Sequence, residues 1–469
     1  MQLSHTVAAV SAVFDEPNLV SAAGLVPLMR LAESAGLQDL ADSHLSVPTD
    51  KGANAGLKVA SVVAGMAAGA DSITDMGLLR HGGMPRLFTG AYAPSTLGSF
   101  LRSFAFGHVR QLDAVASRFL TGLAQHSRLV AGLGDPQGRV LIDIDDTIIE
   151  VHGYAKQGSG FGYSGIRGLN ALLATVTTGQ AAPVIVGQRL RQGSCGSARG
   201  ARRLVADALA TVNKLGQHAG LRPLLRADSA FYGRATIVTA INAGADVSVT
   251  LRLDTTVKKA IASIEETAWA TIEYTDAVYD EPTGCWISRA EVAEIPFTAF
   301  CSARKSDQVP GRLIVRRIPD LNPKADQGQD TIFTTWRFHA FFTTTDPGVM
   351  DTVTADKTHR HHAIIEQVHA DLKNSALAHL PSGKFAANAA WLVLAVMAFN
   401  LTRAAATLTG PALAKATTAT IRRTLVTVPA RIATSARRLT LHLPLAWPWQ
   451  NRWTDLFTAT CDPPTAITY

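Results

Sequence analysis

Apolar and polar positions along the chain separate a helical first part from a strand-rich middle. Residues 18–41 carry leucines near helical spacing, residues 55–68 are small and apolar, and a further helix over 97–106 follows Ser95, its expected N-cap. Several short helices with tight turns predict a helical bundle. Both a helix-turn-helix DNA-binding unit and a bundle that only packs fit this pattern.

From residue 140 the pattern changes to alternating strands and helices. The expected order is three strands, a helix, a short strand that ends in an acid, a helix and a strand, over residues 140–149, 169–177, 182–190, 202–215, 221–227, 234–243 and 246–253. The first three strands can be antiparallel neighbours, and the fourth can lie beside the first. This arrangement would bring Asp145 and Asp228 together at the centre of a sheet.

The remainder of the chain predicts a β-rich insertion and then a return to the first fold. Residues 255–340 are rich in β-branched and aromatic residues with turn residues between them, and Phe341 to Asp346 forms another strand. Two helices are expected at 359–377 and 384–403. The apolar run from Phe385 to Leu401 contains two asparagines and is short for a membrane span, so we expect a buried helix and no membrane.

Composition adds a charge signal near the C-terminal end. The 469 residues allow two to four domains, and the net charge is +7. Residues 401–469 hold eight basic and two acidic residues, which accounts for nearly all of the excess. An anionic partner such as nucleic acid fits this charge, as does a solvated helix face.

The four cysteines point to a reducing environment. Cys195, Cys285, Cys301 and Cys461 are scattered without a C-x-x-C pair, which argues against a zinc ribbon and a disulfide scaffold. The first residues show no basic region followed by an apolar core, so no signal peptide is expected. These features predict a cytoplasmic protein.

The strand from Val140 to Glu150 carries the strongest chemical signal. Its period of two places Asp143 and Asp145 on one face. Burying a carboxylate without a partner is costly, and a metal ion or phosphoryl chemistry would offset that cost. The alternative is a cap or turn cluster at a strand end.

A glycine-rich segment follows this strand. Residues 153–168 contain six glycines together with Lys156 and Arg167, but no G-x-x-x-x-G-K-[ST] phosphate loop. Either a flexible loop or a close approach of the backbone to a phosphodiester explains it.

One face of the helix at 359–373 is also chemically suggestive. His362, Glu366, His369 and Lys373 fall at i, i+4, i+7 and i+11. This face is either a solvated stripe or a functional one, with Glu366 as a metal ligand and Lys373 as a phosphate contact. Three acids on three separated segments, with basic neighbours, describe a two-metal phosphodiester site.

These residues resemble bacterial insertion-sequence transposases of the DDE class, over about residues 50–405. The first acid matches as Asp145-Asp146-Thr147, the second follows a short apolar strand as Asp228, and Glu366-x6-Lys373 matches the third motif. His359 and His362 stand where that motif has Tyr and Arg.

The resemblance implies an α/β fold: an RNase H-like core interrupted by a β-rich insertion, with a helical N-terminal domain and a basic C-terminal tail. The implied boundaries are 1–135 for the DNA-binding or pairing domain, 136–254 and 341–405 for the core, 255–340 for the insertion and 406–469 for the tail.

The implied activity is cut-and-paste DNA transposition. Two Mg²⁺ ions, for which Mn²⁺ substitutes, would be bridged by Asp145 and bound by Asp228 and Glu366. The partners would be double-stranded DNA, as terminal inverted repeats and target, and a second copy of the chain in a nucleoid-associated homodimer. DNA contacts would come from Lys373, His362, Lys156, Arg167, Arg422 and Arg423.

Three alternatives remain on the sequence. Asp143-Ile-Asp145-Asp146-Thr147 fits the D-x-D-x-T motif of haloacid-dehalogenase-type phosphatases, with Asp143 as nucleophile. A non-catalytic DNA-binding relic would use only the basic surfaces. A zinc hydrolase built on the histidines is weaker, since no H-E-x-x-H occurs.

Overall fold

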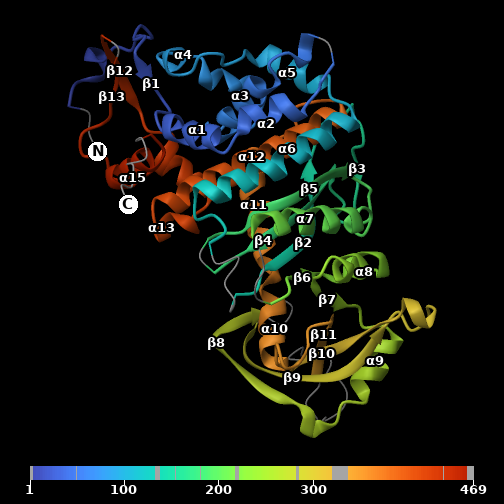
Figure 1. Ribbon diagram of the computed structural model, residues 1–469. Helices are drawn as coiled ribbons and strands as arrows, with labels where there is room; N and C mark the ends of the chain where they lie inside the picture. The colour runs from blue at the N-terminus through green and yellow to red at the C-terminus, as the bar shows by residue number, and fades with distance from the viewer. Residues whose placement is uncertain are drawn as a thin grey trace, which may run out of the picture.

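The computed structural model describes residues 4–48, 50–131, 138–153, 155–179, 181–216, 221–280, 285–319, 336–436 and 438–461. It is a mixed α/β structure in which three parts lie one below another in the view of Figure 1. Helices from both ends of the chain lie at the top of the view, the central sheet lies in the middle, and the β-rich insertion lies at the bottom.

The first part is helical, as predicted. Its α-helices are α1 (Leu25–Ser34), α2 (Leu37–His44), α3 (Ala55–Ala68), α4 (Met84–Leu87), α5 (Pro94–Arg102) and α6 (Phe106–His126). Two predicted details are wrong. Residues 18–41 begin with the short strand β1 (Leu19–Val20) and break at Gly36, whose φ of +81° suits glycine. The N-cap of α5 is Ala93, so Ser95 lies inside the first turn.

The central sheet follows the predicted order of elements. Its strands are β2 (Leu141–Glu150), β3 (Gly160–Phe161), β4 (Arg167–Thr177), β5 (Val184–Gln192), β6 (Leu224–Ala227) and β7 (Asp246–Leu251). Strand β4 is antiparallel to both β2 and β5, whereas β2, β6 and β7 run parallel. Helices α7 (Ala201–Leu215) and α8 (Arg234–Asn242) form the crossovers. The predicted neighbourhood of β2 and β6 is confirmed.

The insertion extends the same sheet. After α9 (Thr255–Ala262), strands β8 (Ala270–Asp280), β9 (Cys285–Ala299) and β10 (Val309–Pro319) form an antiparallel meander. Strand β11 (Trp336–Thr343) joins β10 to β7. The order across this half is therefore β7-β11-β10-β9-β8. Residues 281–284 and 320–335 of the predicted insertion lie outside the described residues.

The long helix predicted at 359–377 is wrong as a single helix. The structure has α10 (Thr352–Arg360), a 3-10 turn at His361–Ala363 and α11 (Ile364–Lys373). Buried His359 hydrogen-bonds the hydroxyls of Ser248 (2.8 Å) and Thr250 (3.0 Å), which fixes the end of α10 against β7. The following turn then sets a new start for α11.

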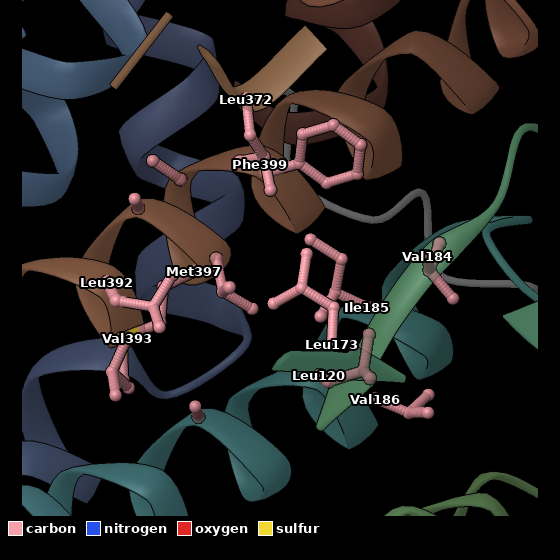
Figure 2. Close-up of a cluster of buried hydrophobic side chains, with 14 of the residues drawn as sticks. Leu120, Leu173, Val184, Ile185, Val186, Leu372, Leu392, Val393, Met397 and Phe399 are labelled. Atoms are coloured by element: carbon pink, nitrogen blue, oxygen red, sulfur yellow. The ribbon is translucent and has the colours of Figure 1, made fainter. Parts of the chain in front are cut away.

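Helix α12 (Phe385–Leu408) forms the centre of the molecule. It is the one helix among the described residues that is long and apolar enough to cross a membrane, but 89% of its most apolar window is buried inside the fold. It packs on α6 and α3 on one side and on β5 on the other. Figure 2 shows this junction, where Met397 and Phe399 of α12 approach Leu173 of β4 and Ile185 of β5. The predicted buried helix is confirmed.

The C-terminal region folds back onto the N-terminal helices. It contains α13 (Pro411–Ala414), α14 (Thr418–Ile421), a π-helical turn (Arg422–Val426), β12 (Ala430–Ser435), β13 (Arg438–His442) and α15 (Gln450–Cys461). Strand β12 pairs with β1, and α15 packs on α1. The two ends of the chain therefore build one part of the structure together (Figure 1).

Candidate active site

Two of the predicted acids lie at the same level on neighbouring strands. Ile144 of β2 pairs with Ala227 of β6 in parallel register, so Asp145 and Asp228 are the next residues along both strands. Asp228 directly follows the last residue of β6. It caps the following 3-10 turn by accepting a hydrogen bond from the Ala230 N–H (2.9 Å). The carboxyl ends of parallel strands meet at one edge of a sheet, which is why two acids distant in sequence come together.

The third predicted acid lies on a helix that packs on the same strand. Glu366 is an exposed residue in the first turn of α11, and α11 contacts β2. The opposite side of α11 is fixed by Asp371, which accepts hydrogen bonds from Arg403 of α12 and from the N–H (3.0 Å) and hydroxyl (3.0 Å) of Thr418. Figure 2 places Leu372 of α11 in the apolar junction beside Phe399. The helix therefore has a fixed position relative to Asp145.

Electrostatics single out Asp145 among the acids of β2. Burial raises the pKa of Asp145 to about 7, against a lowering hydrogen bond from the Asp146 N–H. The nearby charges of Asp228 and Glu366 contribute to the same rise. Burial also raises the pKa of Asp228, although its hydrogen bond from Ala230 opposes the rise. Burial and neighbouring carboxylates therefore both raise the pKa values of Asp145 and Asp228.

Asp143, two residues earlier, has a different environment. Both of its carboxylate oxygens accept hydrogen bonds at 2.7 Å from the guanidinium of Arg226, and both side chains are only 1% exposed. Arg226 also donates to the carbonyl of Thr358 at the end of α10. A carboxylate that is fully paired and closed to solvent does not fit the nucleophile of a phosphatase.

Two further side chains of α11 lie beside Asp145. His369 Nδ1 is 3.6 Å from Asp145 Oδ2, and burial lowers the pKa of His369 to about 4, with Lys373 adding to this effect. The imidazole is therefore neutral at pH 7. Burial lowers the pKa of Lys373, whereas the charge of Asp145 opposes this change. Glu366, His369 and Lys373 therefore all lie in α11 at the predicted spacing, although His369 is buried.

Asp146 points to the other face of β2 and organises a loop there. Its carboxylate accepts hydrogen bonds from Asn170 (2.7 Å), Ser197 (3.1 Å) and Arg191. Buried Arg191 also donates to the carbonyls of Ser197 (2.7 Å) and Arg199. Residues 196–199 are therefore fixed beside the acid that directly follows Asp145.

The three acids have the chemistry of a divalent-cation site. Carboxylate oxygens are the ligands that Mg²⁺ prefers, and burial together with the neighbouring carboxylates raises the pKa of Asp145. Within the described residues, no group of three His, Cys, Asp or Glu side chains is already close enough to hold a metal ion. Since like charges repel, a cation would also be needed to draw the carboxylates together.

The residues predicted to contact DNA are dispersed. Lys156 donates to the carbonyls of Leu380 and Ser382 (3.5 Å), and Arg167 donates to the carbonyl of Gly153 and to Ser159 Oγ (2.8 Å). His362 Nδ1 lies 2.8 Å from the carbonyl of His359, in the turn before α11.

The two C-terminal arginines lie in the part built from both chain ends. The guanidinium of Arg423 lies 5.4 Å from the ring centre of Trp449, and Arg422 approaches Gly69 at the end of α3. Every one of these DNA contacts stays a prediction.

Sequence reasoning missed two partners of the acids. Arg226 interrupts the apolar strand Leu224-Leu-Arg-Ala, and a charged residue there is a signal for a buried partner. Only the pairing of β6 with β2 identifies that partner as Asp143. The sequence placed His369 on the helix face but did not show that its side chain lies 3.6 Å from Asp145. It also did not show the 3-10 turn that precedes α11.

Comparison with known families now adds to this geometry. The model of one family, described as transposase DDE domain group 1, matches residues 4–461. The match includes the central sheet, the insertion and the helices from both ends of the chain. No curated protein matches the chain.

Proposed function

The chain belongs to the transposase DDE domain family, and from this premise we propose that it performs cut-and-paste DNA transposition with Asp145, Asp228 and Glu366 as its catalytic acids. Membership implies DNA binding and nuclease or strand-transfer chemistry. The observation that carries the assignment of residues is the level placement of Asp145 and Asp228 on β2 and β6, with α11 packed on β2.

We infer that strands β5-β4-β2-β6-β7 form an RNase H-like core. Three antiparallel strands followed by two parallel ones, with helical crossovers, support this inference. In this interpretation the insertion lengthens the core sheet at β7, and the third acid returns to the core on α11.

Asp145, Asp228 and Glu366 would hold two Mg²⁺ ions, or Mn²⁺ in their place, with Asp145 shared between them. When bound, such ions lower the pKa of water and stabilise charge on the reacting phosphate. The carboxylates hold and orient; none of them acts as a nucleophile. Lys373, beside Asp145, would bind a DNA phosphate oxygen and keep the scissile bond at this edge.

The proposed chemistry has two steps. In the first, a water oxygen bonds to phosphorus at the element end while the P–O3′ bond breaks, which leaves a 3′-hydroxyl and a 5′-phosphate. In the second, that hydroxyl attacks a phosphodiester of target DNA, and the new bond replaces a P–O3′ bond there. The same hydroxyl can first attack the opposite strand to give a hairpin end. Neutral His369 would pack beside Asp145 and limit its rotation.

The test is Mg²⁺-dependent nicking of a DNA fragment that carries the ends of the encoding element. Glu366→Ala should reduce nicking by at least about 10³-fold. When catalytic residues act as one unit, the loss of one member removes most of the effect of the whole unit. Glu33→Ala, on the exposed side of α1, is the matched control and should nick like the wild type. Retained nicking in Glu366→Ala would remove it from the site. Intact binding without nicking by the wild type would favour the relic.

A further inference from the structure

A hairpin beyond the acids combines exposed aromatic rings with a purely basic stretch of sequence. Between Glu150 and Asp207 the chain contains seven lysines and arginines and no acidic residue. Within this stretch, Phe161 is 66% exposed and Tyr163 is 110% exposed. Exposed rings in a region with this charge are suited to nucleic acid, whose bases stack on aromatic faces and whose phosphates bind arginine.

We call residues 155–168 the glycine hairpin. Strand β2 runs five residues past Asp145 before the connection to β3 and β4 begins, which is a distance of about 17 Å at the usual rise per residue. DNA rises 3.4 Å per nucleotide along each strand, so the hairpin lies about five nucleotides from the acids. It stands at the same sheet edge as Asp228, because β2 and β6 are parallel.

Contacts on both sides keep the glycine hairpin in a defined position. The Gln157 N–H donates to the carbonyl of Gly383 (2.9 Å), and Gln157 Oε1 accepts from the Phe385 N–H (3.1 Å). Gly158 has a φ of +79°, and a Cβ there would lie 2.8 Å from the ring of Phe385. Lys156 and Arg167 brace the same segment through backbone carbonyls. The rings are therefore displayed on a preorganised support, which lowers the entropic cost of binding.

A second basic segment lies next to the hairpin. Gly193 packs so closely on the carbonyls of Gly160 and Gly168 that a Cβ would lie 2.4 and 2.0 Å from them. The loop that follows is fixed by Arg191 and leads to Arg199 and Arg202, both exposed. Exposed arginines thus follow, along the chain, the segment that packs on the hairpin.

From this juxtaposition we propose that the glycine hairpin binds an unpaired stretch of DNA strand about five nucleotides from the cleavage point. Phe161 and Tyr163 stack on bases, and Arg199 and Arg202 bind the adjoining phosphates. Stacking needs a free base face, which an intact duplex does not offer, so the surface selects DNA that is locally opened or single-stranded. This inference rests on the proposed function, since it assumes that the nearby acids act on DNA.

The test measures binding of the full chain to labelled dT20 and to a 20-base-pair duplex, in EDTA, so that cleavage plays no part. Phe161→Ala/Tyr163→Ala removes two stacking rings and should weaken dT20 binding by at least about 30-fold, while duplex binding changes less than about twofold. Phe14→Ala, another fully exposed ring but outside the basic stretch, should leave both affinities unchanged. Phe161→Tyr/Tyr163→Phe should keep dT20 binding, which separates stacking from a folding defect.

A separate variant tests the arginines. Arg199→Ala/Arg202→Ala should reduce the slope of log affinity against log salt for dT20 by about 1.4, since each phosphate contact on a single strand contributes about 0.7. Unchanged dT20 affinity in the double aromatic variant, or an equal loss on duplex, would overturn the proposal. Neither result touches metal-dependent nicking, which Glu366→Ala tests independently.

Discussion

The inner and outer halves of strand β2 carry the same residue type in opposite environments. Asp143, on the inner half, is closed to solvent and paired through both oxygens with Arg226. Asp145, two residues on and on the same face, is 27% exposed and has Asp228 and Glu366 as charged neighbours. Asp143 is paired directly with an arginine, whereas the partners of Asp145 are His369, at 3.6 Å, and the charge of Lys373.

In the proposed site, this one strand would serve both stability and chemistry. The ion pair of Asp143 connects β2, β6 and the end of α10, and so it supports the elements from which the outer acids project. Among the described residues, no arginine forms an ion pair with Asp145. Spacing alone gives both aspartates the same direction, so the proposed roles rest on the resemblance and on the partners of each acid.

The largest effect on stability is expected at the inner half. Asp143→Asn leaves the Arg226 guanidinium buried with no counter-charge, so the free energy of unfolding should fall by about 3–5 kcal/mol in a denaturant titration. Asp143→Asn/Arg226→Met removes both charges and should recover most of that loss. If the single variant is as stable as the wild type, the pair is not structural and the comparison fails.

In the outer half, the ionisation of Asp145 should make stability depend on pH. Because the pKa of Asp145 is raised in the folded state to about 7, the folded protein binds more protons than the unfolded one between about pH 4 and 7. The contribution of Asp145 to stability is therefore lost as pH rises through 7. Asp145→Asn should stabilise the metal-free protein at pH 8, by at most about 4 kcal/mol, and have little effect at pH 4.

Thermal unfolding of both proteins at several pH values in EDTA measures this difference. Added Mg²⁺ should stabilise the wild type at pH 8 more than the variant, because the ion binds the ionised carboxylate. Parallel pH profiles for the two proteins would show that folding does not raise the pKa of Asp145.

A smaller effect is expected at the basic end of α11. Lys373→Ala should weaken binding of duplex DNA several-fold and lower the slope of log affinity against log salt by about 0.9, the value of one phosphate contact. Lys258→Ala, an exposed lysine on α9, is the control and should keep the wild-type slope. Equal slopes for all three proteins would remove Lys373 from the DNA path.

A second set of predicted DNA contacts lies at the C-terminal arginines, beside Trp449 and Gly69. Arg422→Ala/Arg423→Ala should reduce the salt slope by up to about 1.8 if both contact phosphate. The loss should be smaller if Arg423 stays on Trp449, 5.4 Å away. A slope identical to that of the wild type would confine DNA binding to the sheet edge.

Local patterning predicted the elements well wherever side chains repeat regularly. The period of two in β2, the apolar run of α12 and the short strand before Asp228 all predicted elements that the structure contains. The sequence allowed β2, β4 and β5 to be antiparallel neighbours with β6 beside β2, and the structure has this arrangement. These features depend on near neighbours in the sequence, which is why the sequence reveals them.

What the sequence could not predict depends on contacts between distant segments. The break at 361–363 follows from His359 binding β7, the Arg226 pair follows from strand register, and the joining of β1 to β12 links opposite ends of the chain. The resemblance selected Asp145 over Asp143, and the tertiary partners of the two acids, which the sequence does not show, support the same choice.

The most direct test of this account is Mg²⁺-dependent nicking of element-end DNA by Asp145→Asn, with folding verified by its thermal transition. The account predicts a folded protein that binds this DNA with wild-type affinity and nicks it at least about 10³-fold more slowly. Nicking at the wild-type rate by folded Asp145→Asn would contradict the account, because Asp145 would then have no part in the chemistry.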